Sequence, residues 1–84
     1  MAIKIVVLER GWVVVGHYQE DGDWITINGA VIRVWGTSKG LPELINGPKK
    51  ETILDKASKP MKFLKANTIL IIDAEEDKWS EILK

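Results

Sequence analysis

A short acidic turn between two stretches of alternating residues is the feature that most constrains the fold. The turn is Glu20-Asp21-Gly22-Asp23, and its Asp-Gly step readily adopts the positive φ angles of a tight β-turn. Residues 12–18 before the turn and residues 24–28 after it place their side chains alternately on two faces, as strands do. The sequence therefore predicts a β-hairpin, and with it antiparallel β structure.

Further β-rich stretches lie on both sides of this hairpin. Both faces of residues 12–18 carry apolar side chains, so this strand is expected inside the sheet, with a bend or bulge at Gly16. Asn28-Gly29 is expected to form a bend or bulge rather than a second turn, because strand character resumes at once. The remaining pattern predicts a turn at 9–11 and strands at 3–8, 31–35, 52–54, 58–65 and 66–72.

Two short helices are also predicted. Thr37 or Ser38 can cap the first, Pro42 suits its first turn, and Asn46-Gly47-Pro48 ends it after about two turns. The second is expected over residues 73–84, where acids near its start complement the helix dipole. Both helices are brief interruptions of a chain that is otherwise strand-like.

These elements indicate a mainly β fold (β-rich α+β). We expect a small antiparallel meander or partial barrel of five to six strands, with one short inserted helix and a C-terminal helix. The 84 residues are expected to form a single domain, 1–84, with a β-rich body at 1–73 and the helix at 74–84. Such a chain buries only about 60–65% of the surface its unfolded form exposes, which disfavours a deep catalytic cleft.

Twelve basic and twelve acidic residues cancel over the whole chain but not along it. Residues 36–65 contain seven lysines against three acids, a balance of +4, whereas residues 66–84 contain two lysines against five acids, a balance of −3. Two solvated surfaces of opposite sign would explain this pattern, and so would a central patch that faces an anion. The neutral total disfavours general DNA binding, which needs many phosphate contacts.

Residues suited to catalysis or metal binding are sparse. The chain has no cysteine, and its one histidine, His17, lies in a predicted strand beside apolar residues, where a packing or surface role is expected. The acids of the 20–23 turn lack the spacing and the distal glutamate of a calcium loop. We therefore predict no catalytic residues, no metal ligands, no cofactor and no enzymatic activity.

The strongest candidate for a binding site is the segment that leads into the first helix. A helix N-terminus offers free amides to an anion, and a tryptophan beside a cation is a common way to stack on and neutralise a nucleotide. The predicted ligand-binding residues are Arg33, Trp35, Gly36, Thr37, Ser38, Lys39 and Gly40. The residue order of a P-loop is absent, and a capped turn with an exposed lysine explains the same residues equally well.

Four tryptophans are many for a chain of this length. Aromatic side chains supply much of the apolar burial in a small domain, so most of them are expected in the core. Trp12 and Trp24 lie on predicted strands and Trp79 on the last helix. Only Trp35, beside the candidate site, is expected to be partly exposed.

The C-terminal helix is expected to begin at Asp73 as its N-cap and to carry one apolar stripe. It can dock on its own sheet, cover a sheet edge or contact a second subunit, and the open edges of a small sheet favour a homo-oligomer. Its acids can also imitate nucleic acid toward a protein partner. The predicted partner-binding residues are Glu75, Glu76, Asp77, Trp79 and Glu81.

Several stretches between residues 10 and 73 together form a recognisable pattern. They are R-G-W-V-V-V-G at 10–16, R-x-W-G-T-x-K-G-L-x-E-L at 33–44, N-G-P at 46–48 and E-T-x-L-D at 51–55. In this pattern the chain resembles a group of small, uncharacterised proteins encoded by bacteriophages and prophages. The resemblance implies a phage context, in which small proteins often act by binding a host signalling nucleotide or a host defence protein.

Three functional hypotheses follow from the sequence. The first is a non-enzymatic protein that captures a phosphate-bearing small molecule, such as a nucleotide signal of host defence. The second is an inhibitor of a host defence complex that uses the acidic C-terminal helix, and the third is a small structural phage protein. We expect a cytoplasmic location, in the bacterial host if the protein is phage-encoded, because the apolar runs are too short to cross a membrane.

Overall fold

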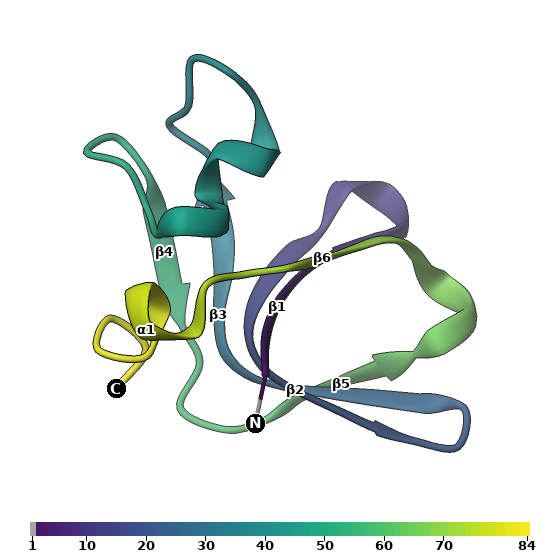
Figure 1. Cartoon of the computed structure of the whole chain (residues 1–84). Coiled ribbons are helices and arrows are strands. Elements are labelled where there is room, and N and C mark those ends of the chain that lie inside the picture. Colours follow the sequence, from purple (N-terminus) through teal and green to yellow (C-terminus); the bar gives the residue numbers. More distant parts are fainter. Residues whose placement is uncertain (1) are drawn as a thin grey trace.

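Six antiparallel strands in one open sheet dominate the computed structural model, which describes residues 2–84 (Figure 1). The strands are β1 (Ile3–Leu8), β2 (Val13–Asp21), β3 (Trp24–Val34), β4 (Ile53–Lys56), β5 (Met61–Leu64) and β6 (Thr68–Asp73). The short helices are η1 (Glu9–Gly11), η2 (Leu41–Asn46) and η3 (Lys65–Asn67), all of 3-10 type, and α1 (Glu76–Trp79). The predicted mainly β class is confirmed.

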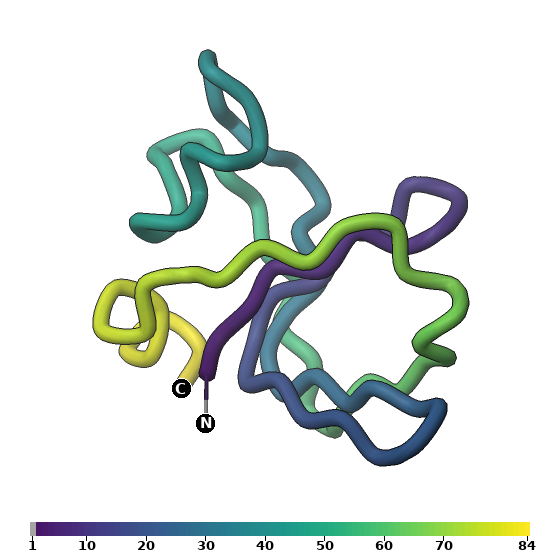
Figure 2. Tube along the Cα trace, turned by 45° about the vertical axis from the view of Figure 1, so that its right-hand side comes forward, coloured from purple at the N-terminus to yellow at the C-terminus, as the bar shows by residue number. Residues whose placement is uncertain are grey.

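The long strand β3 organises the sheet. It pairs with β2 along one side, through the predicted hairpin at Gly22, whose φ is 61°. On its other side the first half of β3 pairs with β5 and the second half with β4, so these two strands lie toward opposite ends of β3 (Figure 1). The order β4-β3-β2-β1-β6 completes the sheet, which curls strongly in the view of Figure 2.

Two facing glycines allow the backbones of β2 and β3 to approach closely. Gly16 pairs with Gly29 in an unbroken register, so the predicted irregularity is not a bulge. A Cβ atom on Gly16 would lie 2.2 Å from the carbonyl oxygen of Asn28, and one on Gly29 would lie 2.0 Å from that of Val15. Only glycine fits at both positions, because either side chain would overlap the opposite backbone.

Both faces of the sheet are buried, each by a different cover. On one face, side chains of β1, β2 and β3 pack against Leu41 and Leu44 of η2 and Trp79 of α1. On the other face, Val6, Val14, Ile25 and Ile27 form a second core against which residues of β5 pack. The curl of the sheet thus lets a chain of 84 residues enclose apolar side chains on two sides.

Trp79 joins the C-terminal segment to η2. Its side chain is fully buried, and its Nε1 donates a 2.8 Å hydrogen bond to the backbone carbonyl of Leu44. The predicted helix over 73–84 with an Asp73 cap is wrong, because Asp73 pairs with Lys4 as the last residue of β6. Pairing with β1 continues one residue further, where the amide of Ala74 donates to the carbonyl of Ile3, so α1 begins only at Glu76.

The other three tryptophans lie at the surface. Trp12, Trp24 and Trp35 are 57%, 45% and 42% exposed, so the expectation that Trp12 and Trp24 are core residues is wrong. Each lies where its strand meets a turn or loop, beyond the part of the sheet that is covered on both faces. The largest core side chain is instead Trp79, from outside the sheet.

Replacement of Trp79 is expected to destabilise the whole fold. Trp79→Ala should lower the free energy of unfolding by about 3–5 kcal/mol, because it removes a fully buried ring and leaves a cavity between α1 and η2. Urea denaturation followed by circular dichroism measures the change. Trp24→Ala is the matched control at an exposed position, and an equal loss in the two variants would contradict the role of Trp79.

Candidate functional site

Arg33 lies at the end of β3, where an aspartate of β4 orients it. Its Nε and Nη2 donate hydrogen bonds to the Asp55 carboxylate at 3.0 Å (Nε–Oδ2) and 3.1 Å (Nη2–Oδ1). Both side chains are about half exposed, so this ion pair contributes little to stability. Its bidentate geometry nevertheless holds the guanidinium plane in one orientation.

Arg33 lines a groove that contains a second arginine and an exposed indole. We call it the Trp–Arg groove; its volume is about 390 Å³, and its walls are Arg10, Gly11, Trp12, Val13, Val31, Ile32, Arg33 and Asp55. Pairing of Val14 with Val31 brings Trp12 and Arg33 to the same end of the hairpin, because each lies two residues beyond that pair. The groove is therefore assembled by the β2–β3 register.

A left-handed turn places Arg10 beside Trp12. Arg10 has φ 67° and ψ 18°, and it is the one non-glycine residue with positive φ among residues 2–84. This conformation costs an L-residue about 1–2 kcal/mol, and the turn is closed by a 2.7 Å hydrogen bond from the Leu8 amide to the Trp12 carbonyl. Arg10 and Trp12 also line an adjoining hollow of about 200 Å³ that reaches Phe63 and Asn67.

Arg10 and Trp12 were not among the predicted site residues. The sequence predicts the turn at 9–11, but it also predicts a buried Trp12, whereas the side chain is exposed. An arginine and a tryptophan that flank a turn glycine are the signal that could have pointed to this corner of the molecule.

The predicted segment from Trp35 to Gly40 forms a loop beside the groove rather than its wall. Thr52 Oγ1 donates a 2.5 Å hydrogen bond to the Trp35 carbonyl. Gly36 has φ 65°, and a Cβ on it would lie 2.3 Å from the backbone of Glu51. The start of the loop is thus fastened to the turn before β4. Of the seven predicted ligand residues, only Arg33 lines the groove as the structure describes it.

The rest of this loop uses its hydroxyl locally. Thr37 Oγ1 accepts a 3.2 Å hydrogen bond from the Gly40 amide, whereas Ser38 and Lys39 are exposed. The predicted side-chain cap is not seen, since among the described residues no side chain caps η2. Because η2 is six residues of 3-10 helix, the expected pull of a helix dipole on an anion is small here.

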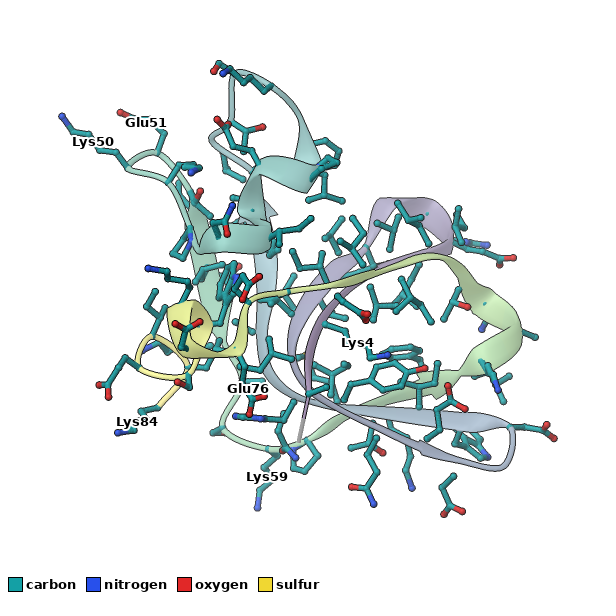
Figure 3. All side chains as sticks on the ribbon, in the orientation of Figure 1. Lys4, Lys50, Glu51, Lys59, Glu76 and Lys84 are labelled. Atoms are coloured by element: carbon teal, nitrogen blue, oxygen red, sulfur yellow. The ribbon has the colours of Figure 1, made fainter. Side chains whose placement is uncertain are left out.

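A second hollow, lined by lysines, lies near the C-terminus. It measures about 380 Å³, and its lining includes His17, Lys56, Ser58, Lys59 and Lys84. Figure 3 shows the side chains of Lys59 and Lys84 directed outward, away from the body of the fold. These cations do not converge on one point, so the Trp–Arg groove is the better-defined site.

A hydrogen-bonded chain of polar side chains ties β2 to the segment after β5. The Tyr18 hydroxyl donates to Glu20 at 2.6 Å, and Lys65 Nζ donates to the other Glu20 oxygen at 2.9 Å. Burial, followed by the adjacent Glu20 carboxylate, raises the pKa of Tyr18 to about 12. The hydrogen bonds from Tyr18 and then Lys65 lower the pKa of Glu20.

The C-terminal acids lie apart from the groove. Glu75, Glu76, Asp77 and Glu81 are exposed, but Trp79 is buried in the core, so only the acids are accessible to a partner. Among residues 2–84, no helix is long and apolar enough to span a membrane.

The sequence and the structure were compared with those of known proteins, and no match was found. No family model matches the chain, and neither a curated protein nor a solved structure matches it. The resemblance to phage proteins therefore stays a prediction, and function has to be argued from the site.

The ionisation of Tyr18 provides a direct check of the polar chain. The raised pKa means that the folded state favours the protonated phenol, so this stabilisation is complete below the ordinary value of 10.0 and is lost as pH rises through about 12. Tyr18 is the only tyrosine, and tyrosinate absorbance should show a midpoint near 12 that falls in Glu20→Gln. Asp21→Asn removes a nearby charge without touching the hydroxyl and should leave the midpoint unchanged. A wild-type midpoint near 10.0 would disprove the interaction.

Proposed function

We propose that this chain is a non-enzymatic binding protein that captures a phosphate-bearing small molecule in the Trp–Arg groove. The observation that carries the proposal is the convergence of Arg10, Trp12 and Arg33 on one groove of about 390 Å³. Ligand pockets of small molecules commonly measure about 300–1,000 Å³, so a nucleotide is a ligand of suitable size.

One nitrogen of the Arg33 guanidinium is available to bind an anion. Its hydrogen bonds to Asp55 use Nε and Nη2, so Nη1 has no partner among the described residues. A phosphate oxygen can therefore bind Arg33 without breaking the pair with Asp55. Arginine suits this task because its planar donors match phosphate geometry, and the exposed indole of Trp12 offers a surface on which a base can stack.

The lining of the groove supports binding rather than chemistry. Its one carboxylate, Asp55, is already engaged by Arg33, and its other polar groups are guanidinium groups and an indole. A general base or nucleophile needs a titratable or hydroxyl group within reach of the substrate. In the phage context implied by the sequence pattern, capture of a host defence nucleotide signal would remove that signal from solution.

The alternative of a protein–protein inhibitor rests on the exposed acids Glu75, Glu76, Asp77 and Glu81. Their side chains would imitate nucleic acid toward a host defence protein. Deletion of residues 74–84 is a poor test of this idea, because it also removes the core residue Trp79. Charge reversal at Asp77 leaves the core intact and is the cleaner variant.

Native mass spectrometry of protein purified from a bacterial host tests the ligand proposal first. A nucleotide bound at integral stoichiometry is expected, and titration calorimetry with adenine and guanine mononucleotides and cyclic dinucleotides then measures affinity. Arg33→Ala should weaken binding about tenfold or more, since a hydrogen bond to a charged group contributes about 1.5–3 kcal/mol. Lys50→Ala should have no effect, because Lys50 does not line the groove and its side chain is directed outward from a loop (Figure 3).

A second pair of variants separates the groove from the neighbouring loop. Trp12→Ala should lower affinity, whereas Trp35→Ala should not, because only Trp12 lines the groove. The reverse result would move the site to the 35–40 segment that the sequence predicts. No bound molecule and no binding to any nucleotide probe would overturn the proposal and favour the inhibitor or structural hypotheses.

A further inference from the structure

The outer edge of β6 is apolar and pairs with no described strand along most of its length. η2 lies against its C-terminal end, where the Glu75 amide donates a 2.9 Å hydrogen bond to the Ile45 carbonyl. β6 ends the strand order, so its outer side pairs with no strand of residues 2–84. Ile69, Leu70 and Ile71 are 66%, 48% and 37% exposed, three consecutive large apolar side chains on one edge strand. Strand edges of this kind are templates for pairing with another chain.

The register shows which backbone groups face outward. The amide of Ala74 donates to the carbonyl of Ile3 at 3.0 Å, so these residues form a hydrogen-bonded pair with β1. Such pairs alternate along an antiparallel ladder, which directs the N–H and C=O of Ile72 and Leu70 toward β1. The N–H and C=O groups of Ile71 and Asp73 therefore point away from the sheet. Those of Ile71, which lies farther from η2, are the ones best placed to pair with an added strand.

The other two open edges among the described residues carry the protection that β6 lacks. β4 and β5 have four residues each; β4 ends in Asp55 and Lys56, and β5 follows Pro60 and contains Lys62. Charges and proline are the usual means of blocking edge-to-edge pairing. β6 has six residues and carries no charge before Asp73, its last residue.

Charges at the two ends of β6 indicate which chain would pair with it. Lys62 and Lys65 precede the strand, and Asp73, Glu75 and Asp77 lie at its end or follow it. Within one chain Lys65 pairs with Glu20, and Asp73 with Lys4, but all of these acids and lysines except Lys4 are solvent-exposed. If a second β6 runs antiparallel to the first, the basic end of each copy lies across from the acidic end of the other.

We propose that a second copy of this chain adds to β6, so that two sheets join into one across an antiparallel β6–β6 pair. The arrangement is two-fold symmetric about Ile71, so the outward backbone groups of Ile71 in one copy bind those of Ile71 in the other. It also places a partner strand beside the exposed side chains of Ile69, Leu70 and Ile71. The arrangement also gives a physical role to Lys62, Lys65 and the acids at the end of β6. The proposed dimer contact does not overlap the Trp–Arg groove, because none of Ile69, Leu70 and Ile71 lines the groove.

Cysteine cross-linking tests this pairing, since the chain contains no cysteine of its own. At the two-fold axis Ile71 faces its own copy, so mild oxidation of Ile71→Cys should give covalent dimers in high yield. Ile53→Cys, on β4 and 40% exposed, is the matched control and should stay monomeric. Equal cross-linking at Ile53 would place the contact elsewhere and overturn the proposal.

Sedimentation equilibrium provides a second readout that does not depend on cysteine. Ile69→Lys should weaken dimerisation about tenfold or more with an unchanged circular dichroism spectrum, whereas Ile53→Lys should not weaken it. A wild-type protein that stays monomeric throughout the micromolar range would also overturn the proposal. So would an Ile69→Lys variant that dimerises as well as wild type. Nucleotide binding in a monomeric protein would refute the dimer alone, and a dimer without nucleotide binding would refute the groove alone.

Discussion

The close contact between β2 and β3 at Gly16 and Gly29 is the constraint on which the rest of the structure depends. The central hairpin has apolar side chains on both faces, and a chain this short cannot cover two faces of a broad flat sheet. The paired glycines let the backbones of the two strands approach more closely than any side chain would allow, within a sheet that curls strongly (Figure 2). β5 then covers one face, while η2 and α1 cover the other, and the two cores share the same three strands.

The curl of the sheet leaves large side chains exposed near the ends of the strands. A curled sheet encloses the middle of each strand better than its ends, and Trp12, Trp24 and Trp35 all lie near ends. An exposed indole at a strand end is a stacking surface, and its chemistry depends on what lies beside it. At Trp12 the neighbours are two arginines, whereas Trp24 has the single cation Lys62, 5.9 Å from its ring centre. Among these corners within residues 2–84, the groove is thus the one that two arginines and a tryptophan line together.

Local patterns in the sequence predict the strands well but not what lies between them. The Asp21-Gly22 turn and the alternation around it specify the hairpin, because turn chemistry and side-chain period act within a few residues. The predicted extent of the C-terminal helix is wrong, because Asp73 pairs with Lys4, and local patterns do not reveal pairing between residues so far apart in the chain. The same reason explains why only part of the site is predicted. Arg33 is a predicted site residue, but its position in one groove with Arg10 and Trp12 depends on the strand register and on the left-handed backbone of Arg10.

The charged residues at the sheet edges determine how readily each edge can pair with another chain. A net charge of zero provides no long-range repulsion between copies, so protection of each edge falls to its own residues. β4 and β5 have such residues, whereas the one charge of β6 is its last residue, Asp73, and other lysines and acids lie beyond its two ends. Charges so placed would not block an incoming strand but would select its direction, since only antiparallel addition sets lysine against acid. In the proposed dimer, this role would fall to Lys62 and Lys65, two of the seven lysines of the basic stretch, and to the acids at the end of β6.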